Sequence, residues 1–158
     1  MRRVNSDQLR NIIFGIEDSL VSTVGFLFGL ASANEYDTRQ IILAGIVLIA
    51  VEALSMGAGS YLTETEVREI QNHKREGNPI KDGLLMFASY ILAGLLVLSP
   101  YFILSPQVAR FVSVGVSVVS LFLLGFIPTK NKATGLRMVL VAGSAILVGF
   151  LVAVIFSV

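Results

Sequence analysis

Five long apolar stretches constrain this chain more than any other feature of its sequence. Each holds about 20 mostly apolar residues, the length that an α-helix needs to cross the hydrocarbon core of a bilayer. They run over about 11–33, 41–62, 83–104, 108–127 and 138–158. Of the 158 residues 54% are hydrophobic, more apolar surface than a soluble domain of this size can bury. The sequence therefore predicts an all-α integral membrane protein, with five transmembrane helices forming a single transmembrane domain over 1–158.

The basic residues are distributed unevenly between the two ends of these spans. Ten of the twelve Lys and Arg residues fall on the side of the N-terminus, and only Arg39 and Arg110 fall on the other. The ten are Arg2, Arg3, Arg10, Arg68, Lys74, Arg75, Lys81, Lys130, Lys132 and Arg137. Since short loops rich in Lys and Arg stay in the cytoplasm, we predict a cytoplasmic N-terminus and a C-terminus outside. The N-terminal stretch is a poor signal peptide, so the first span is expected to be retained.

Composition excludes several other classes of protein. The net charge is only +1, so the chain has no strong positive electrostatic field that would attract nucleic acid. Cysteine is absent, which excludes disulfides and thiolate metal sites. An enzyme is not expected either, because no nucleophile–base pair or metal triad is evident.

Three acidic residues lie inside predicted spans with no basic residue at comparable depth. Glu17 and Asp18 fall in the first span and Glu52 in the second. A charge near the bilayer centre costs at least about 2.5–3.5 kcal/mol, so such residues normally face a bundle interior or a water-filled path. Unpaired acids of this kind favour the binding of a cation.

Helical spacing sorts the residues of the first span. Asp18 shares one narrow face with Ser22, Gly25 and Gly29. Glu17 lies roughly 100° away around the helix, nearer the helix start. We predict that both acids are metal-site residues, with Asp18 as a ligand and Glu17 at the inner mouth of the path.

On the second span, Glu52 and Met56 share a face with Gly59 and Thr63. Carboxylate oxygens bind hard divalent cations, and a thioether adds softness to the site. We therefore predict that Glu52 and Met56 converge with Asp18 on a metal, and that the metal is Fe²⁺ or Mn²⁺.

Purely structural interpretations of these residues remain open. A methionine in a membrane helix is usually packing, Asp18 could bond a serine or the backbone, and Glu17 could extend to the lipid headgroups. Glycines most simply allow close helix packing. The functional interpretation adds four secondary residues that line the metal path: Ser22, Gly57, Gly59 and Ser60. Since five helices enclose little space alone, we predict a two-fold homodimer.

Two runs of this sequence resemble the signatures of the vacuolar iron transporter family. The first is Ile-Phe-Gly-Ile-Glu-Asp-Ser-Leu-Val-Ser-Thr over 13–23, and the second is Ala-Leu-Ser-Met-Gly-Ala-Gly-Ser-Tyr-Leu over 53–62. Pro100 and Tyr101 near the end of the third span also fit. The resemblance implies a homodimer that exports Fe²⁺ or Mn²⁺ from the cytoplasm in exchange for protons. It also implies that Asp18 and Met56 line the path at the dimer interface.

The chain departs from the family pattern at three places. The family often has Asn-Asp-Gly where this chain has Glu17-Asp18-Ser19, and an acid before the second-span tyrosine where this chain has Ser60. Members similar to the plant and protist transporters carry a long, Glu-rich metal-binding domain between the second and third spans. Here the cytoplasmic loop 63–82 has only twenty residues. The chain thus resembles a short form of the family, which points to a prokaryotic cell membrane.

That loop holds two further candidate residues. Glu66 and Glu69 are spaced i, i+3 and could share a helix face, so they are candidates for recruiting metal from the cytoplasm. The alternative is a solvated helix end with balanced charges. His73 is the only histidine, and we expect it to be exposed.

The residues support one main hypothesis and two weaker ones. The first is a proton-coupled exporter of divalent metal, in which the transported Fe²⁺ or Mn²⁺ is cargo and no cofactor is permanently bound. Protons would release the metal because both compete for the same carboxylate lone pairs. The alternative is a non-transporting membrane interaction or scaffold protein whose buried acids serve assembly. A transporter of organic cations is disfavoured, because Trp is absent and the four Tyr residues are scattered.

Overall fold

The computed structural model is all-helical and describes residues 6–33, 36–71 and 77–156. Its elements are α1 (Ser6–Ser32), α2 (Thr38–Ile70), α3 (Pro79–Leu98), the 3₁₀ turn η1 (Ser99–Phe102), α4 (Pro106–Thr129) and α5 (Lys132–Phe156). Five helices are long and apolar enough to cross a membrane, which confirms the predicted all-α class and the number of spans. Five residues named above, His73, Arg2, Arg3, Lys74 and Arg75, lie outside the described residues.

The helix α2 is much longer than its predicted span. It has 33 residues, which corresponds to about 50 Å, whereas the hydrocarbon core is about 30 Å thick. The segment 63–70 is polar but contains neither Gly nor Pro, so nothing in it interrupts the helix. The first part of the predicted loop 63–82 is therefore helical, and α2 extends beyond the apolar span.

Local sequence fixes where two of the helices begin. Asp37 and Gln40 form a capping box at the start of α2, with the Asp37 carboxylate accepting from the Gln40 backbone N–H at 2.8 Å. Asn78 caps α3 and is followed by Pro79 in the first turn, where a missing N–H costs nothing.

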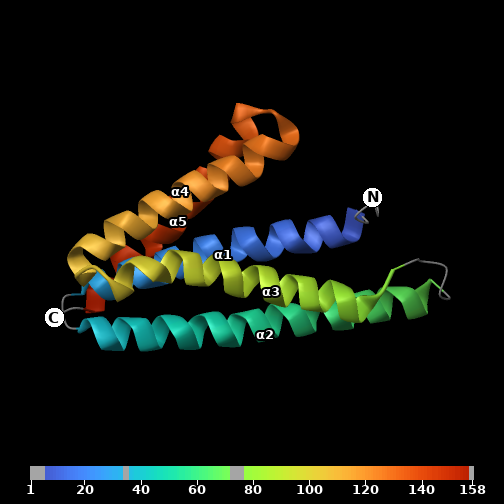
Figure 1. The fold of residues 1–158 in the computed structure, drawn as a ribbon, viewed down its shortest axis with the longest axis horizontal. Helices are drawn as coiled ribbons and strands as arrows, with labels where there is room; N and C mark the ends of the chain where they lie inside the picture. The colour runs from blue at the N-terminus through green and yellow to red at the C-terminus, as the bar shows by residue number, and fades with distance from the viewer. Residues whose placement is uncertain (1–5, 34–35, 72–76, 157–158) are drawn as a thin grey trace.

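The helix α1 occupies the centre of the bundle (Figure 1). It packs against α3 on one side and α5 on the other, while α2 packs mainly against α3 and α4 packs against α5. Figure 1 shows α1, α2 and α3 running side by side, whereas the α4–α5 hairpin diverges from α1 toward its own turn. The first three helices therefore form one layer, which carries the predicted metal ligands.

A seam of small residues joins α1 to α5. A Cβ added to Gly25 would lie 2.9 Å from the Ala145 carbonyl oxygen, and one added to Gly29 would lie 2.8 Å from that of Gly149. A Cβ on Gly149 would in turn collide with the Gly25 carbonyl. Small residues thus let the two backbones touch, as is common between membrane helices.

Replacing Gly149 by Val is expected to lower the melting temperature by roughly 5–10 °C. The added side chain meets backbone rather than a movable side chain, and overpacking of this kind costs about 1–3 kcal/mol. Gly143→Val is the matched control, because a Cβ at Gly143 has nothing within 4 Å. Thermal unfolding of both purified variants in detergent checks the expectation, and equal melting temperatures would contradict it.

Candidate functional site

Three helices meet at the hydroxyl group of Tyr90. Tyr90 lies on α3 and is fully buried. Its hydroxyl donates a hydrogen bond to the carboxylate of Glu52 on α2, and it lies 2.7 Å from the Ser22 hydroxyl on α1. Since the Tyr90 proton is directed to Glu52, Ser22 is the donor in the second bond. The tyrosine therefore holds the Glu52 carboxylate in a fixed position beside α1.

Ser19 fixes the register between α1 and α3 next to this tyrosine. It is fully buried, and its hydroxyl donates to the Tyr90 carbonyl oxygen at 2.7 Å. Across from it, a Cβ on Gly94 would lie 2.9 Å from Ser19 Oγ, so the glycine makes room for the serine. The residue that departs from the family pattern at 19 thus has a structural role beside the site.

Asp18 lies next to this network on the partly exposed side of α1. It is partly buried, and its carboxylate is near enough to interact electrostatically with Glu52 and with Tyr90. Within the described ranges, the single ion pair joins Arg10 to Glu64, so no basic side chain neutralises Asp18 or Glu52. The structure therefore brings together two of the predicted ligands as neighbouring, unneutralised acids.

Met56 lies one turn further along α2, in a groove between α1 and α2. We call this the α1–α2 groove; its volume is ≈ 700 Å³. Two residues predicted to share its face, Gly59 and Thr63, line the groove with Met56, whereas Glu52 of the same predicted face does not. Ser60 lines it as well. The other lining residues are Arg10, Asn11, Phe14, Ser55, Glu64 and Met86.

The remaining predicted residues lie elsewhere. Ser22 borders a mainly apolar groove between α1 and α5, and Glu17 is partly buried on α1. Gly57 lies at the α2–α3 contact, because a Cβ there would lie 3.0 Å from the Gly83 carbonyl oxygen of α3. Glu66 and Glu69 are exposed on the last turns of α2, outside the lining of the α1–α2 groove.

Sequence reasoning missed two residues of this region, Tyr90 and Glu64. Tyr90 carries no local signal, because its role depends on which face of α3 meets α1 and α2. Glu64 follows Met56 and Ser60 in steps of four residues, which places all three on one helix face. That spacing would have identified it, had the helix been extended beyond 62.

A single chain offers few ligands for a metal ion. Over 6–33, 36–71 and 77–156, no group of three or more His, Cys, Asp or Glu side chains is placed to hold one. Asp18, Glu52 and Met56 supply two carboxylates and one thioether, whereas hard divalent cations take about six ligands. The site of one chain can therefore bind a cation only with water or with ligands from elsewhere.

Comparison with known proteins identifies relatives over almost the whole chain. "Vacuolar iron transporter 1" of Oryza sativa subsp. japonica is 26% identical over 209 aligned positions, which cover 93% of this chain and 82% of the relative. The protein of the same name from Tulipa gesneriana is 24% identical, with 92% and 83% covered. Over a shorter stretch of 68 residues, "Vacuolar iron transporter 1" of Eucalyptus grandis is 37% identical, covering 43% of this chain and 26% of the relative.

The sequence profile of the VIT family matches residues 9–77 and 64–155. The two matches overlap at the α2–α3 connection, and the alignment to the rice protein is longer than this chain. Both facts agree with a short form that lacks residues at this connection. Because the two matches together extend from the start of α1 almost to the end of α5, the chain belongs to the VIT family.

Proposed function

We propose that this protein transports iron, as Fe²⁺, across a membrane. The observation that carries the proposal is the pair of neighbouring carboxylates of Asp18 and Glu52, deep in two apolar helices and without a basic partner among the described residues. Such a pair is costly unless it serves a cation. The printed names of the relatives, which are vacuolar iron transporters, support iron as the cargo.

The proposal includes a homodimer that completes the coordination of the metal. One chain contributes Asp18, Glu52 and Met56, and a two-fold axis beside them would double the set to four carboxylates and two thioethers. A closed two-fold dimer is the commonest oligomer. The chain has no cysteine, so single cysteines can be introduced for cross-linking. Native mass spectrometry of the purified protein is expected to give twice the 17.0 kDa chain mass.

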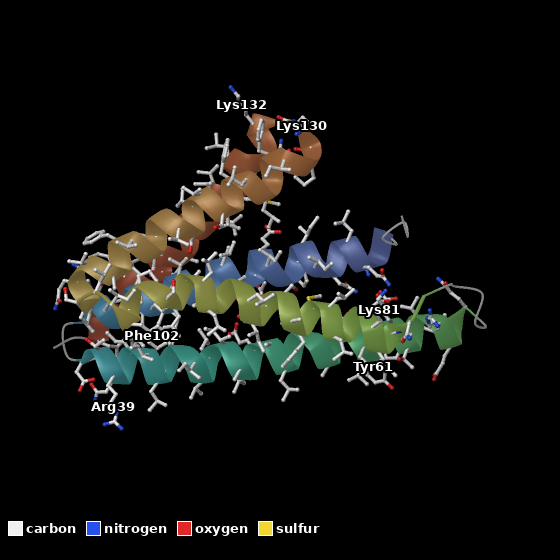
Figure 2. The ribbon with its side chains drawn as sticks, viewed as in Figure 1. Arg39, Tyr61, Lys81, Phe102, Lys130 and Lys132 are labelled. Carbon is white, nitrogen blue, oxygen red and sulfur yellow. The ribbon has the colours of Figure 1, made fainter. Side chains whose placement is uncertain are left out.

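Transport is proposed to be export coupled to protons. Figure 2 shows Lys81 at the opposite end of the bundle from Arg39, with Lys130 and Lys132 at the α4–α5 turn. This distribution supports a cytoplasmic end at Lys81. Metal and protons compete for the same carboxylates, so protons arriving from outside would release the metal there.

Liposomes containing the purified protein test this function. Fe²⁺ influx is expected when the lumen is more acidic than the medium, and it is expected to stop when an ionophore dissipates the proton gradient. Protein-free liposomes are the control. Fe²⁺ flux that does not depend on the gradient would leave transport in place but remove proton coupling, and the absence of flux would contradict the proposed function.

Thermal stabilisation by a panel of divalent cations tests the identity of the cargo. A ligand that binds only the folded protein stabilises it by about 2.7 kcal/mol when its concentration is 100 times its Kd. We expect Fe²⁺ and Mn²⁺ to raise the melting temperature more than Mg²⁺ or Ca²⁺, because a thioether is a poor ligand for hard cations. Equal shifts for all four cations would argue against Met56 as a ligand.

The scaffold hypothesis is favoured by one observation. The Tyr90 hydroxyl joins Glu52 and Ser22, so the acid has a structural partner. On this hypothesis, substituting the acids lowers the amount of dimer but leaves any metal flux of the assembled fraction unchanged. Flux measured per mole of dimer separates the two functions.

The cellular membrane is a separate proposal. The named relatives are vacuolar and come from plants, so they give no support to the predicted prokaryotic cell membrane. Imaging or fractionation of the tagged chain in its own cells tests that prediction.

A further inference from the structure

An ion pair closes one end of the α1–α2 groove. Arg10 on α1 donates from Nη2 to Glu64 Oε1 on α2 at 2.7 Å. The two partners differ in environment: the Glu64 side chain is 7% exposed, whereas that of Arg10 is 60% exposed. The carboxylate thus belongs to the groove, and the guanidinium covers it from the solvent side.

Two polar groups without hydrogen-bond partners line the same groove as this carboxylate. Asn11 is 4% exposed and its side-chain nitrogen has no hydrogen-bond partner, nor has the buried Ser60 hydroxyl. Both residues line the groove. A buried polar group that bonds nothing costs about 1–3 kcal/mol. An amide can turn to present either oxygen or nitrogen, so Asn11 can offer an oxygen to a cation.

These groups form a line leading to Met56. Met56, Ser60 and Glu64 are spaced by four residues on one face of α2, and each step of four advances about 6 Å along the helix. Glu64 lies beyond the apolar span, and Met56 lies one turn from Glu52. Oxygen ligands thus mark a route from the helix end toward the proposed central site.

We propose that Glu64, with Asn11 and Ser60, is a second cation site at the cytoplasmic mouth of the groove, and that Arg10 occupies it as an exchangeable counter-ion. The site takes a divalent cation, which displaces the Arg10 guanidinium and then passes to Met56. This inference rests on the proposed transport function and adds a recruitment step to it. It also replaces Glu66 and Glu69, which are exposed outside the groove, as the recruiting acids.

The exposure of Arg10 is what makes displacement feasible. The Arg10 side chain is 60% exposed, so its guanidinium regains water as soon as it leaves the carboxylate and does not have to cross the groove. The Glu64 carboxylate, in contrast, cannot turn into water, so it needs a positive group in the groove at all times. A divalent cation supplies that positive charge, and it can also bind the side chains of Asn11 and Ser60, which Arg10 does not bond.

The test uses Mn²⁺ as the probe, with equilibrium binding to the full-length protein followed by electron paramagnetic resonance. Arg10→Gln is expected to tighten Mn²⁺ binding roughly tenfold, because the counter-ion no longer competes. Glu64→Gln is expected to weaken it roughly tenfold, in the range seen when supporting groups of a metal site are removed. The double variant is expected to match Glu64→Gln, and Arg10→Lys to match the wild type.

A merely structural ion pair gives a different pattern. It predicts that Arg10→Gln and Glu64→Gln lower the melting temperature alike and that neither changes Mn²⁺ binding in the folded fraction; that pattern would overturn the proposal. So would weaker binding in Glu66→Gln or Glu69→Gln with no change in Glu64→Gln. If the wild type moves no metal in liposomes, the proposed transport function is wrong. The opposite effects of Arg10→Gln and Glu64→Gln on Mn²⁺ binding still decide whether the second cation site exists.

Discussion

Asp18→Asn is expected to lower Fe²⁺ flux in liposomes by at least about 100-fold. The substitution keeps the size of the side chain and removes its charge, so the metal loses an anionic ligand and can gain only a neutral amide oxygen in its place. Loss of even an outer-shell partner of a metal site costs about 10–100-fold. Initial rates of Fe²⁺ influx under an acidic lumen measure the effect.

The thermal stability of this variant separates transport from structure. Asp18 and Glu52 are neighbouring acids that repel each other, and no basic residue of the described chain neutralises them. Removing one of two like charges relieves that repulsion, so Asp18→Asn is expected to be at least as stable as the wild type. A structural Asp18 predicts the opposite, namely a less stable protein with normal flux per folded dimer.

Two neighbouring variants sharpen this test. Asp18→Glu keeps the charge and is expected to recover part of the flux. Glu17→Gln changes an acid about 100° around the same helix, and it is expected to reduce flux less than Asp18→Asn does. If Asp18→Asn transports Fe²⁺ at the wild-type rate, the proposed site is wrong.

Local periodicity was sufficient to predict much of this protein. Hydropathy alone gives the five helices, because the bilayer requires about 20 apolar residues per span. Steps of three and four residues put Met56, Gly59 and Thr63 on one face, and the structure places all three in one groove. Asp18 and Glu52, predicted to converge, interact electrostatically.

Features that depend on contacts between helices were not predictable. Gly57 and Gly59 are both small, but only Gly57 meets α3, whereas a Cβ on Gly59 has nothing within 4 Å. Tyr90 on α3 bonds both Glu52 on α2 and Ser22 on α1, and Gly94 on the same helix closely meets Ile49 and Ser19 of those two helices. No pattern within one helix carries that information.

The acids in the last turns of α2 show the same limit in a different way. Glu66 and Glu69 were selected by their i, i+3 spacing, on the assumption that a loop began at 63. The helix α2 instead continues to Ile70, which keeps Glu64 in line with Met56 and turns Glu66 and Glu69 outward. Hydropathy locates the membrane part of a helix, and its polar extension has to be judged from helix propensity.

Tyr90→Phe is expected to raise the KM for Fe²⁺ roughly 10–100-fold, the range observed when a group that orients a metal ligand is lost. Phenylalanine fills the same space but cannot donate to Glu52 or accept from Ser22. The Glu52 carboxylate then loses its fixed position beside Asp18. Flux measured against Fe²⁺ concentration gives the KM directly.

Tyr101→Phe is the matched control for this substitution. Tyr101 is also fully buried, but its hydroxyl donates to the Leu27 carbonyl oxygen at 3.3 Å and is bonded to neither acid. It is expected to cost about 1 kcal/mol of stability, the usual contribution of one hydrogen bond, without a change in KM.

A double-mutant cycle assigns the Tyr90 effect to Glu52. If the hydroxyl acts by orienting that carboxylate, Tyr90→Phe changes the KM much less once Glu52 is already Gln, because the two residues act as one unit. Independent effects that multiply would mean that Tyr90 acts on the metal through another group. Coupled effects would show that a buried tyrosine on α3 tunes a ligand on α2, which makes α1, α2 and α3 a single functional layer.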